Sequence, residues 1–86
     1  MKFVDKFTSK EYRYSIGKEE QSGKFYLSIP VSNRMVDYEE YYEITEKEYL
    51  NHSISSENMI KFAQGCRNQN NDALLFIKSG IDRGVG

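Results

Sequence analysis

Two neighbouring runs of alternating apolar and polar residues constrain the fold of this chain more than any other feature of its sequence. In residues 24–31 every second residue is apolar: Phe25, Leu27, Ile29 and Val31. Residues 10–18 alternate in the same way, and the polar, glycine-containing residues 19–23 separate the two runs. Because successive side chains of a strand point to opposite faces, this arrangement predicts an antiparallel β-hairpin with one apolar face.

A third alternating run, residues 36–44, predicts another strand. One side carries Val36, Tyr38, Tyr42 and Ile44, with Glu40 interrupting the apolar positions. The other side carries Asp37, Glu39, Tyr41 and Glu43, and we expect it to face solvent.

The second half of the chain has helical signals. Thr45 and Glu48 have the spacing of a capping box, which predicts a short helix over residues 46–52. Ser55 or Ser56 can cap a second helix over residues 57–67, where Met59, Phe62, Ala63 and Cys66 form one apolar stripe. The continuous apolar run of residues 73–77 predicts an interior strand inserted beside an earlier one.

These elements predict a single α+β domain over residues 1–86. We expect a four-stranded, mainly antiparallel sheet in the order β-β-β-α-α-β, with two short helices packed on one face. For residues 1–9 a short strand, a first helical turn and an irregular segment all remain open. Residues 80–86 lack the spacing of a phosphate-binding loop, and we expect them to form a flexible tail.

The overall charge argues against a nucleic-acid binder. Twelve basic and 13 acidic residues give a net charge of −1, whereas binding to phosphates favours a basic excess. The single cysteine excludes an internal disulfide, and no apolar stretch has the length of a signal peptide or a membrane span. We therefore expect a soluble, cytoplasmic protein.

The candidate catalytic residues have simpler structural explanations. His52 follows a predicted helix without an acidic partner at a suitable spacing, so we expect a solvent-facing loop residue. Cys66 precedes Arg67 but belongs to the apolar stripe, which favours burial over reactivity. One Cys and one His cannot form a structural zinc site. We expect no catalytic residues, no metal, no cofactor and no enzymatic activity. The enzymatic alternative is a small nuclease or hydrolase that uses Arg67, His52 and a carboxylate.

Acidic residues and tyrosines are concentrated in residues 37–49, which contain six acids and four tyrosines against one base, Lys47. This segment is either a solvated edge strand followed by a helix start, or an anionic docking surface on which carboxylates steer a basic partner. For the second interpretation, the predicted partner-binding residues are Asp37, Glu39, Glu40, Tyr41 and Glu43.

Residues 25–33 and 36–42, together with residues 66–67 and 82–84, resemble small bacterial immunity proteins of toxin–immunity systems such as contact-dependent growth inhibition. The resemblance implies a cytoplasmic inhibitor that binds a cognate toxin domain, expected to be a nuclease, and blocks its active site or its access to substrate. It also implies a monomer that forms a heterodimer with the toxin. From the charge and the lack of a membrane span, we expect no nucleic acid and no membrane among its partners. The alternative is a small adaptor or regulatory module, homodimeric through a sheet edge.

Overall fold

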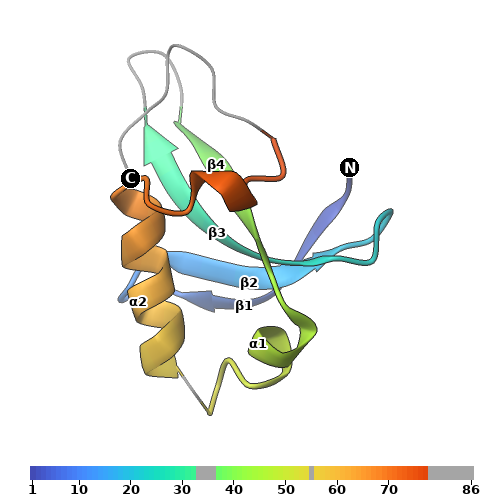
Figure 1. The fold of residues 1–86 in the computed structure, drawn as a ribbon, viewed down its shortest axis with the longest axis horizontal. Coiled ribbons are helices and arrows are strands. Elements are labelled where there is room, and N and C mark those ends of the chain that lie inside the picture. The colour runs from blue at the N-terminus through green and yellow to red at the C-terminus, as the bar shows by residue number, and fades with distance from the viewer. Residues whose placement is uncertain (33–36, 55, 78–86) are drawn as a thin grey trace.

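The computed structural model describes residues 1–32, 37–54 and 56–77, which form one antiparallel sheet and two α-helices. The elements follow one another as β1 (Phe3–Ser9), β2 (Tyr14–Glu19), β3 (Phe25–Ser32), β4 (Asp37–Ile44), α1 (Glu46–Leu50), α2 (Ser56–Arg67) and the short 3₁₀ helix η1 (Asp72–Leu74). The strands lie in the order β1-β2-β3-β4, and each pairs antiparallel with the next (Figure 1). The predicted α+β class, the four-stranded antiparallel sheet and the two helices are thus confirmed.

The main core lies between the sheet and the helices. The apolar faces of β2, β3 and β4 meet the stripe of α2, where Met59, Ala63 and Cys66 are buried. In Figure 1, α2 stands across one side of the sheet, and α1 follows directly from the end of β4. We call the side of the sheet that faces the helices the inner face, and the opposite side the outer face.

The predicted order of the elements was wrong in one respect, because the fourth strand is the N-terminal segment and not residues 73–77. β1 was hard to recognise because its register shifts between Asp5 and Phe7, which indicates a β-bulge. A bulge adds one residue to the strand and reverses the side on which later side chains lie. Phe3 and Phe7 therefore lie on opposite faces, although their spacing in an unbroken strand would place them on the same one.

The apolar run of residues 73–77 closes the edge of β4 instead of entering the sheet. Leu75 forms an isolated antiparallel bridge with Tyr42, and the Phe76 amide donates to the Tyr41 carbonyl at 2.9 Å. Each interior position of the sheet is already taken by a strand that pairs with its neighbour in the chain. This run therefore hydrogen-bonds at an edge of the sheet, and the contacts of Leu75 and Phe76 place it at β4.

Both helices agree with their sequence signals. The capping box of α1 is present, with reciprocal hydrogen bonds between Thr45 and Glu48 at 2.9 and 3.1 Å. This helix ends at Leu50, earlier than predicted, and α2 begins at Ser56, which leaves the cap expected at Ser55 outside the described residues. The tail predicted for residues 80–86 also lies outside them.

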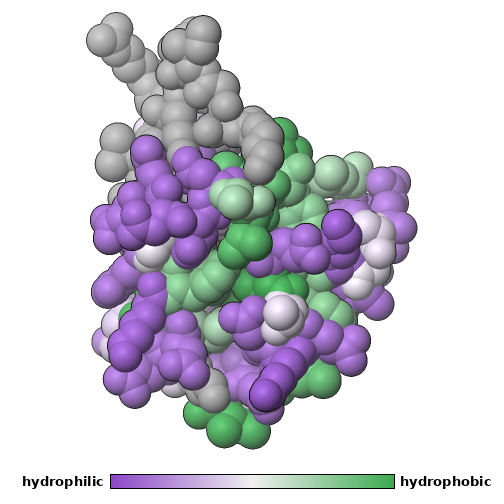
Figure 2. Space-filling view, viewed as in Figure 1, coloured by the Kyte–Doolittle hydropathy of each residue, from purple (hydrophilic) through white to green (hydrophobic). Residues whose placement is uncertain are grey.

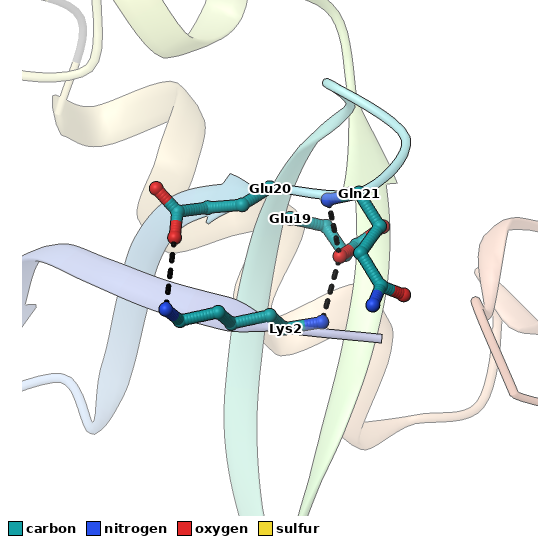
Figure 3. Close-up of polar contacts among 4 residues, drawn as sticks. All are labelled: Lys2, Glu19, Glu20 and Gln21. Atoms are coloured by element: carbon teal, nitrogen blue, oxygen red, sulfur yellow. Dashed lines mark hydrogen bonds and ion pairs between the residues drawn. The ribbon is translucent and has the colours of Figure 1, made fainter.

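The connection between β2 and β3 is organised by one buried carboxylate. Glu19, only 1% exposed, accepts hydrogen bonds from the backbone amides of Lys2, Gln21 and Ser22 at 2.7–2.9 Å. Figure 3 shows the Lys2 and Gln21 amides converging on this side chain, while the Lys2 ammonium group pairs with Glu20. These amides hold the pKa of Glu19 at about 2, since they stabilise the charged form. The carboxylate thereby joins the start of β1 to the hairpin turn.

Candidate docking surface

Three of the predicted partner-binding carboxylates share the outer face of the sheet. The alternation of β4 places Asp37, Glu39 and Glu43 there, and all three are exposed. Tyr41 lies on the same face and is half-buried. We call this set of four residues the acidic surface.

Glu40 is not part of this surface, so the prediction that it faces a partner together with the other four residues needs correction. It lies on the inner face and is only 6% exposed. Its carboxylate accepts a hydrogen bond of 2.7 Å from the hydroxyl of Tyr42, which is fully buried. The physical reason is the alternation of the strand, which sends neighbouring residues to opposite sides.

Aromatic rings hold Tyr41 in a fixed position. Its ring stacks on that of Phe3 with centroids 3.7 Å apart, and meets the Tyr26 ring edge-on at 5.0 Å. Phe3 in turn contacts Phe76 at 5.4 Å. Since Phe3 comes from β1 and Tyr41 from β4, the sheet curls until its first and last strands meet across the outer face. Tyr41 therefore contributes a partly covered and rigid ring to the acidic surface.

Small residues beneath these rings make the curl possible. Ser15, Gly17 and Ser28 line the outer face of β2 and β3 and are buried. A Cβ atom at Gly17 would lie 2.6 Å from the Tyr26 hydroxyl oxygen and closer still to the Val4 carbonyl oxygen. Only glycine leaves room for β1 and the tyrosine ring to approach the sheet so closely.

The curl brings a further carboxylate, Asp5 of β1, towards the acidic surface. Its Oδ1 atom accepts a hydrogen bond from the Tyr26 hydroxyl. Burial raises the pKa of Tyr26, and this hydrogen bond raises it further. Sequence reasoning missed Asp5 because its place depends on the curl and on the bulge in β1. An aspartate between two phenylalanines in an unassigned segment gave no such signal.

Glu39 occupies an unfavourable electrostatic position. Burial raises its pKa, and the charge of Asp5 adds to this effect, while a hydrogen bond with Ser28 opposes it. The described ion pairs are Lys2 with Glu20 and Lys24 with Glu43, at 3.5 and 3.6 Å. Within residues 1–32, 37–54 and 56–77, Asp5, Asp37 and Glu39 thus have no ion-pair partner. A positive group from another molecule would relieve this repulsion.

The candidate catalytic residues have structural roles. Cys66 is buried as predicted, receives a weak hydrogen bond from the Asn71 amide at 3.6 Å, and has its pKa raised by burial to about 12. Arg67 donates to the carbonyls of Tyr12 and Arg13 in the β1–β2 turn. Its guanidinium group is therefore engaged by the backbone.

His52 differs from the expected solvent-facing loop residue. Its ring is half-buried against Phe7, at 5.1 Å between centroids, and lies 6.1 Å from Tyr49. The Nδ1 atom is buried and finds no hydrogen-bond partner among the described residues. Among the residues that the structure describes, no carboxylate forms an ion pair with the imidazole.

The described part of the chain contains no group of three His, Cys, Asp or Glu side chains that could hold a metal ion. None of its helices is long and apolar enough to cross a membrane. In the view of Figure 2, hydrophilic residues cover most of the surface, and hydrophobic residues are exposed along the middle of the molecule and at its lower edge. Leu50 and Ile54, at the end of α1 and just after it, are 64% and 82% exposed.

Comparison with protein-family models, curated proteins and solved structures finds no match.

Proposed function

We propose that this chain is an immunity protein that neutralises a cognate toxin domain by binding it through the acidic surface and Asp5. The observation that carries the proposal is the set of three carboxylates, Asp5, Asp37 and Glu39, that have no ion-pair partner among the described residues. Burial raises the pKa of Tyr41, and the charges of Glu39 and Asp5 lie close enough to raise it further. The ring of Tyr41 is already fixed by stacking on Phe3. A rigid aromatic ring among unpaired charges loses little conformational entropy when it binds a protein.

The same geometry suggests how inhibition works. A nuclease cleft is lined by cations that bind phosphates, and carboxylates on a folded surface can occupy those positions. Tyr41 would pack at the centre of the contact, while the carboxylates steer association from a distance. Binding then blocks substrate access, so the chain itself needs no bond-making group.

Co-purification tests the identity of the partner. A tagged chain should retain the product of the adjacent upstream gene, since toxin and immunity genes are expected to be neighbours, and should inhibit its toxic activity. If that product is not retained, or stays active in a stable complex, the neutralising role is wrong.

Charge reversal tests the surface. In the variant with Asp37→Lys and Glu39→Lys, association should slow about tenfold or more at low salt, and the difference should shrink as salt screens the charges. The control variant, Glu20→Lys with Glu46→Lys, makes the same change in net charge at exposed positions outside the acidic surface. Equal association rates for the two variants would place the docking surface elsewhere.

A small adaptor that dimerises through a sheet edge is the second candidate. The supporting observation is that β1 is an edge strand of the described sheet, bonded only to β2. An edge strand offers free backbone groups for pairing with another strand. Light scattering distinguishes the two candidates, because a monomer at micromolar concentration contradicts the dimeric adaptor.

A further inference from the structure

A hollow with walls of opposite charge lies on the outer face, between the β1–β2 turn and β4. We call it the turn hollow; it has a volume of about 260 Å³, and its lining includes Thr8, Lys10, Arg13, Ser15, Pro30 and Glu39. The register explains this arrangement, since Thr8 pairs with Ser15 and Pro30 pairs with Glu39. Lys10 and Arg13 come from the turn, and Glu39 comes from β4 on the far side of Pro30.

Arg13 has a backbone conformation that residues other than glycine and asparagine rarely adopt. Its φ angle is 55°, in the left-handed region that favours glycine or asparagine. Arg67 fixes the turn by donating to the carbonyls of Tyr12 and Arg13. Burial lowers the pKa of Arg67, and the nearby charge of Arg13 lowers it further. An arginine here therefore carries both a backbone cost and a like-charge repulsion. A ligand that binds its guanidinium group would offset both.

The two walls lack compensating charges among the described residues. Neither Lys10 nor Arg13 forms a described ion pair, and Glu39 forms none either. Between the walls, the hydroxyls of Thr8 and Ser15 lie 3.1 Å apart and are hydrogen-bonded to each other. The hollow thus presents cationic donors on one side, a carboxylate acceptor on the other, and a polar floor between them.

We propose that the turn hollow binds two oppositely charged side chains of the protein partner at once, a basic group at Glu39 and a carboxylate at Lys10 and Arg13. This inference rests on the proposed protein-binding function and makes it more specific. A lone anion such as a phosphate is repelled by Glu39, and a lone cation is repelled by the turn. Only a ligand with both charges satisfies both walls.

Titration of the labelled full-length chain with small probes tests this inference without any toxin domain. The probe is an arginyl-glutamyl dipeptide capped at both ends, compared with capped arginine and capped glutamate, and followed by ¹⁵N–¹H NMR. We expect the dipeptide to shift the amides of Ser15, Val31, Glu39 and the turn residues 10–13. Half-saturation should come at a concentration about threefold lower than for either single-charge probe, because two exposed ion pairs form instead of one. No shift of these amides, or equal half-saturation for all three probes, would overturn the inference.

Variants separate recognition from folding. Arg13→Gly removes one cation and also relieves the strained backbone, so it should fold at least as stably as the parent and need about threefold more dipeptide for half-saturation. Glu39→Gln should weaken the dipeptide to the level of capped glutamate. Lys61→Gln, on the exposed side of α2, removes one positive charge as Arg13→Gly does; it is the matched charge control and should leave the titration unchanged. An unchanged titration in both Arg13→Gly and Glu39→Gln contradicts the inference.

The outcome is independent of the test for the proposed function. If the upstream gene product is retained but the dipeptide does not bind, the docking surface stands and the paired recognition is wrong. If the dipeptide binds as expected but no toxin is retained, the hollow recognises paired charges on a different protein.

Discussion

At Gly17, the space that a side chain would fill on the outer face is already occupied by the Tyr26 hydroxyl and the Val4 carbonyl. The consequence is local but severe, because both neighbours belong to strands that cannot move independently. Gly23 offers a useful contrast. Its φ angle is 74°, and a Cβ atom there would meet nothing within 4 Å.

Gly17→Ala should therefore destabilise the protein by about 3 kcal/mol, because β1 or the Tyr26 ring must move away from the sheet. Gly23→Ala should cost only about 1 kcal/mol, the penalty of a side chain in the left-handed conformation. Urea unfolding of both variants measures the difference. Equal losses for the two variants would mean that β1 does not approach the sheet as closely as described.

At the scale of single elements, the turn between β2 and β3 depends on an ionised side chain. Because Glu19 has its pKa lowered from 4.5 to about 2 in the folded protein, folding favours the charged carboxylate. Its stabilising effect is fully present above the pKa of the unfolded chain and is lost as the pH falls through the folded value.

Glu19→Gln should therefore lower the stability at pH 7, and the difference from the parent should shrink as the pH falls from about 4.5 towards about 2. An amide group at this position presents a donor to backbone amides that are themselves donors. Thermal unfolding between pH 7 and pH 2 tests this, with Glu20→Gln as the control that should have little effect, because its pair with Lys2 is exposed. A difference that does not change with pH would show that the ionised form is unimportant.

How well each element could be predicted depended on whether its signal was local. The capping box of α1 and the alternation of β3 and β4 are local, so they were recognised with nearly correct bounds. The predicted strand over residues 10–18 began too early, because residues 10–13 form the turn that Arg67 holds from the far end of α2. The positions of Asp5 and of residues 73–77 depend on tertiary packing, which periodicity cannot show.

For the candidate surface too, local sequence signals could be predicted and tertiary contacts could not. The alternation of β4 was enough to group Asp37, Glu39, Tyr41 and Glu43, and it could also have separated Glu40 from them. What it could not show was that Phe3 covers one side of Tyr41, or that Glu43 is already paired with Lys24. Both contacts join residues that are distant in the sequence.

At the scale of the whole molecule, the curl of the sheet connects its first and last strands through stacked rings. Strands β1 and β4 are not neighbours in the hydrogen-bonding order, yet Phe3 and Tyr41 stack with an interplanar angle of 12°. Phe76, beyond η1, meets the same ring of Phe3 edge-on. The two ends of the sheet are therefore linked by side chains and not by a strand ladder.

A double-mutant cycle measures this linkage. Phe3→Leu and Tyr41→Leu should each destabilise the protein, and together they should cost less than the sum of the two by about 0.5–1.5 kcal/mol, the range found for aromatic pairs. Phe3→Leu combined with Tyr12→Leu, in the exposed turn, is the control pair and should be additive. Additive losses in the Phe3 and Tyr41 pair would mean that the stacked rings contribute no coupling between the strands.

The small buried residues of the outer face separate the interior of the molecule from its rim. Gly17 leaves no room for a side chain beneath the Tyr26 ring, whereas the side chains of Asp37 and residues 10–13 are exposed at the rim. Substitutions at the rim should change the free energy of unfolding little, whereas larger side chains beneath the rings should destabilise the fold. If the acidic surface binds a partner as proposed, replacing its charges can change the choice of partner while the scaffold stays the same.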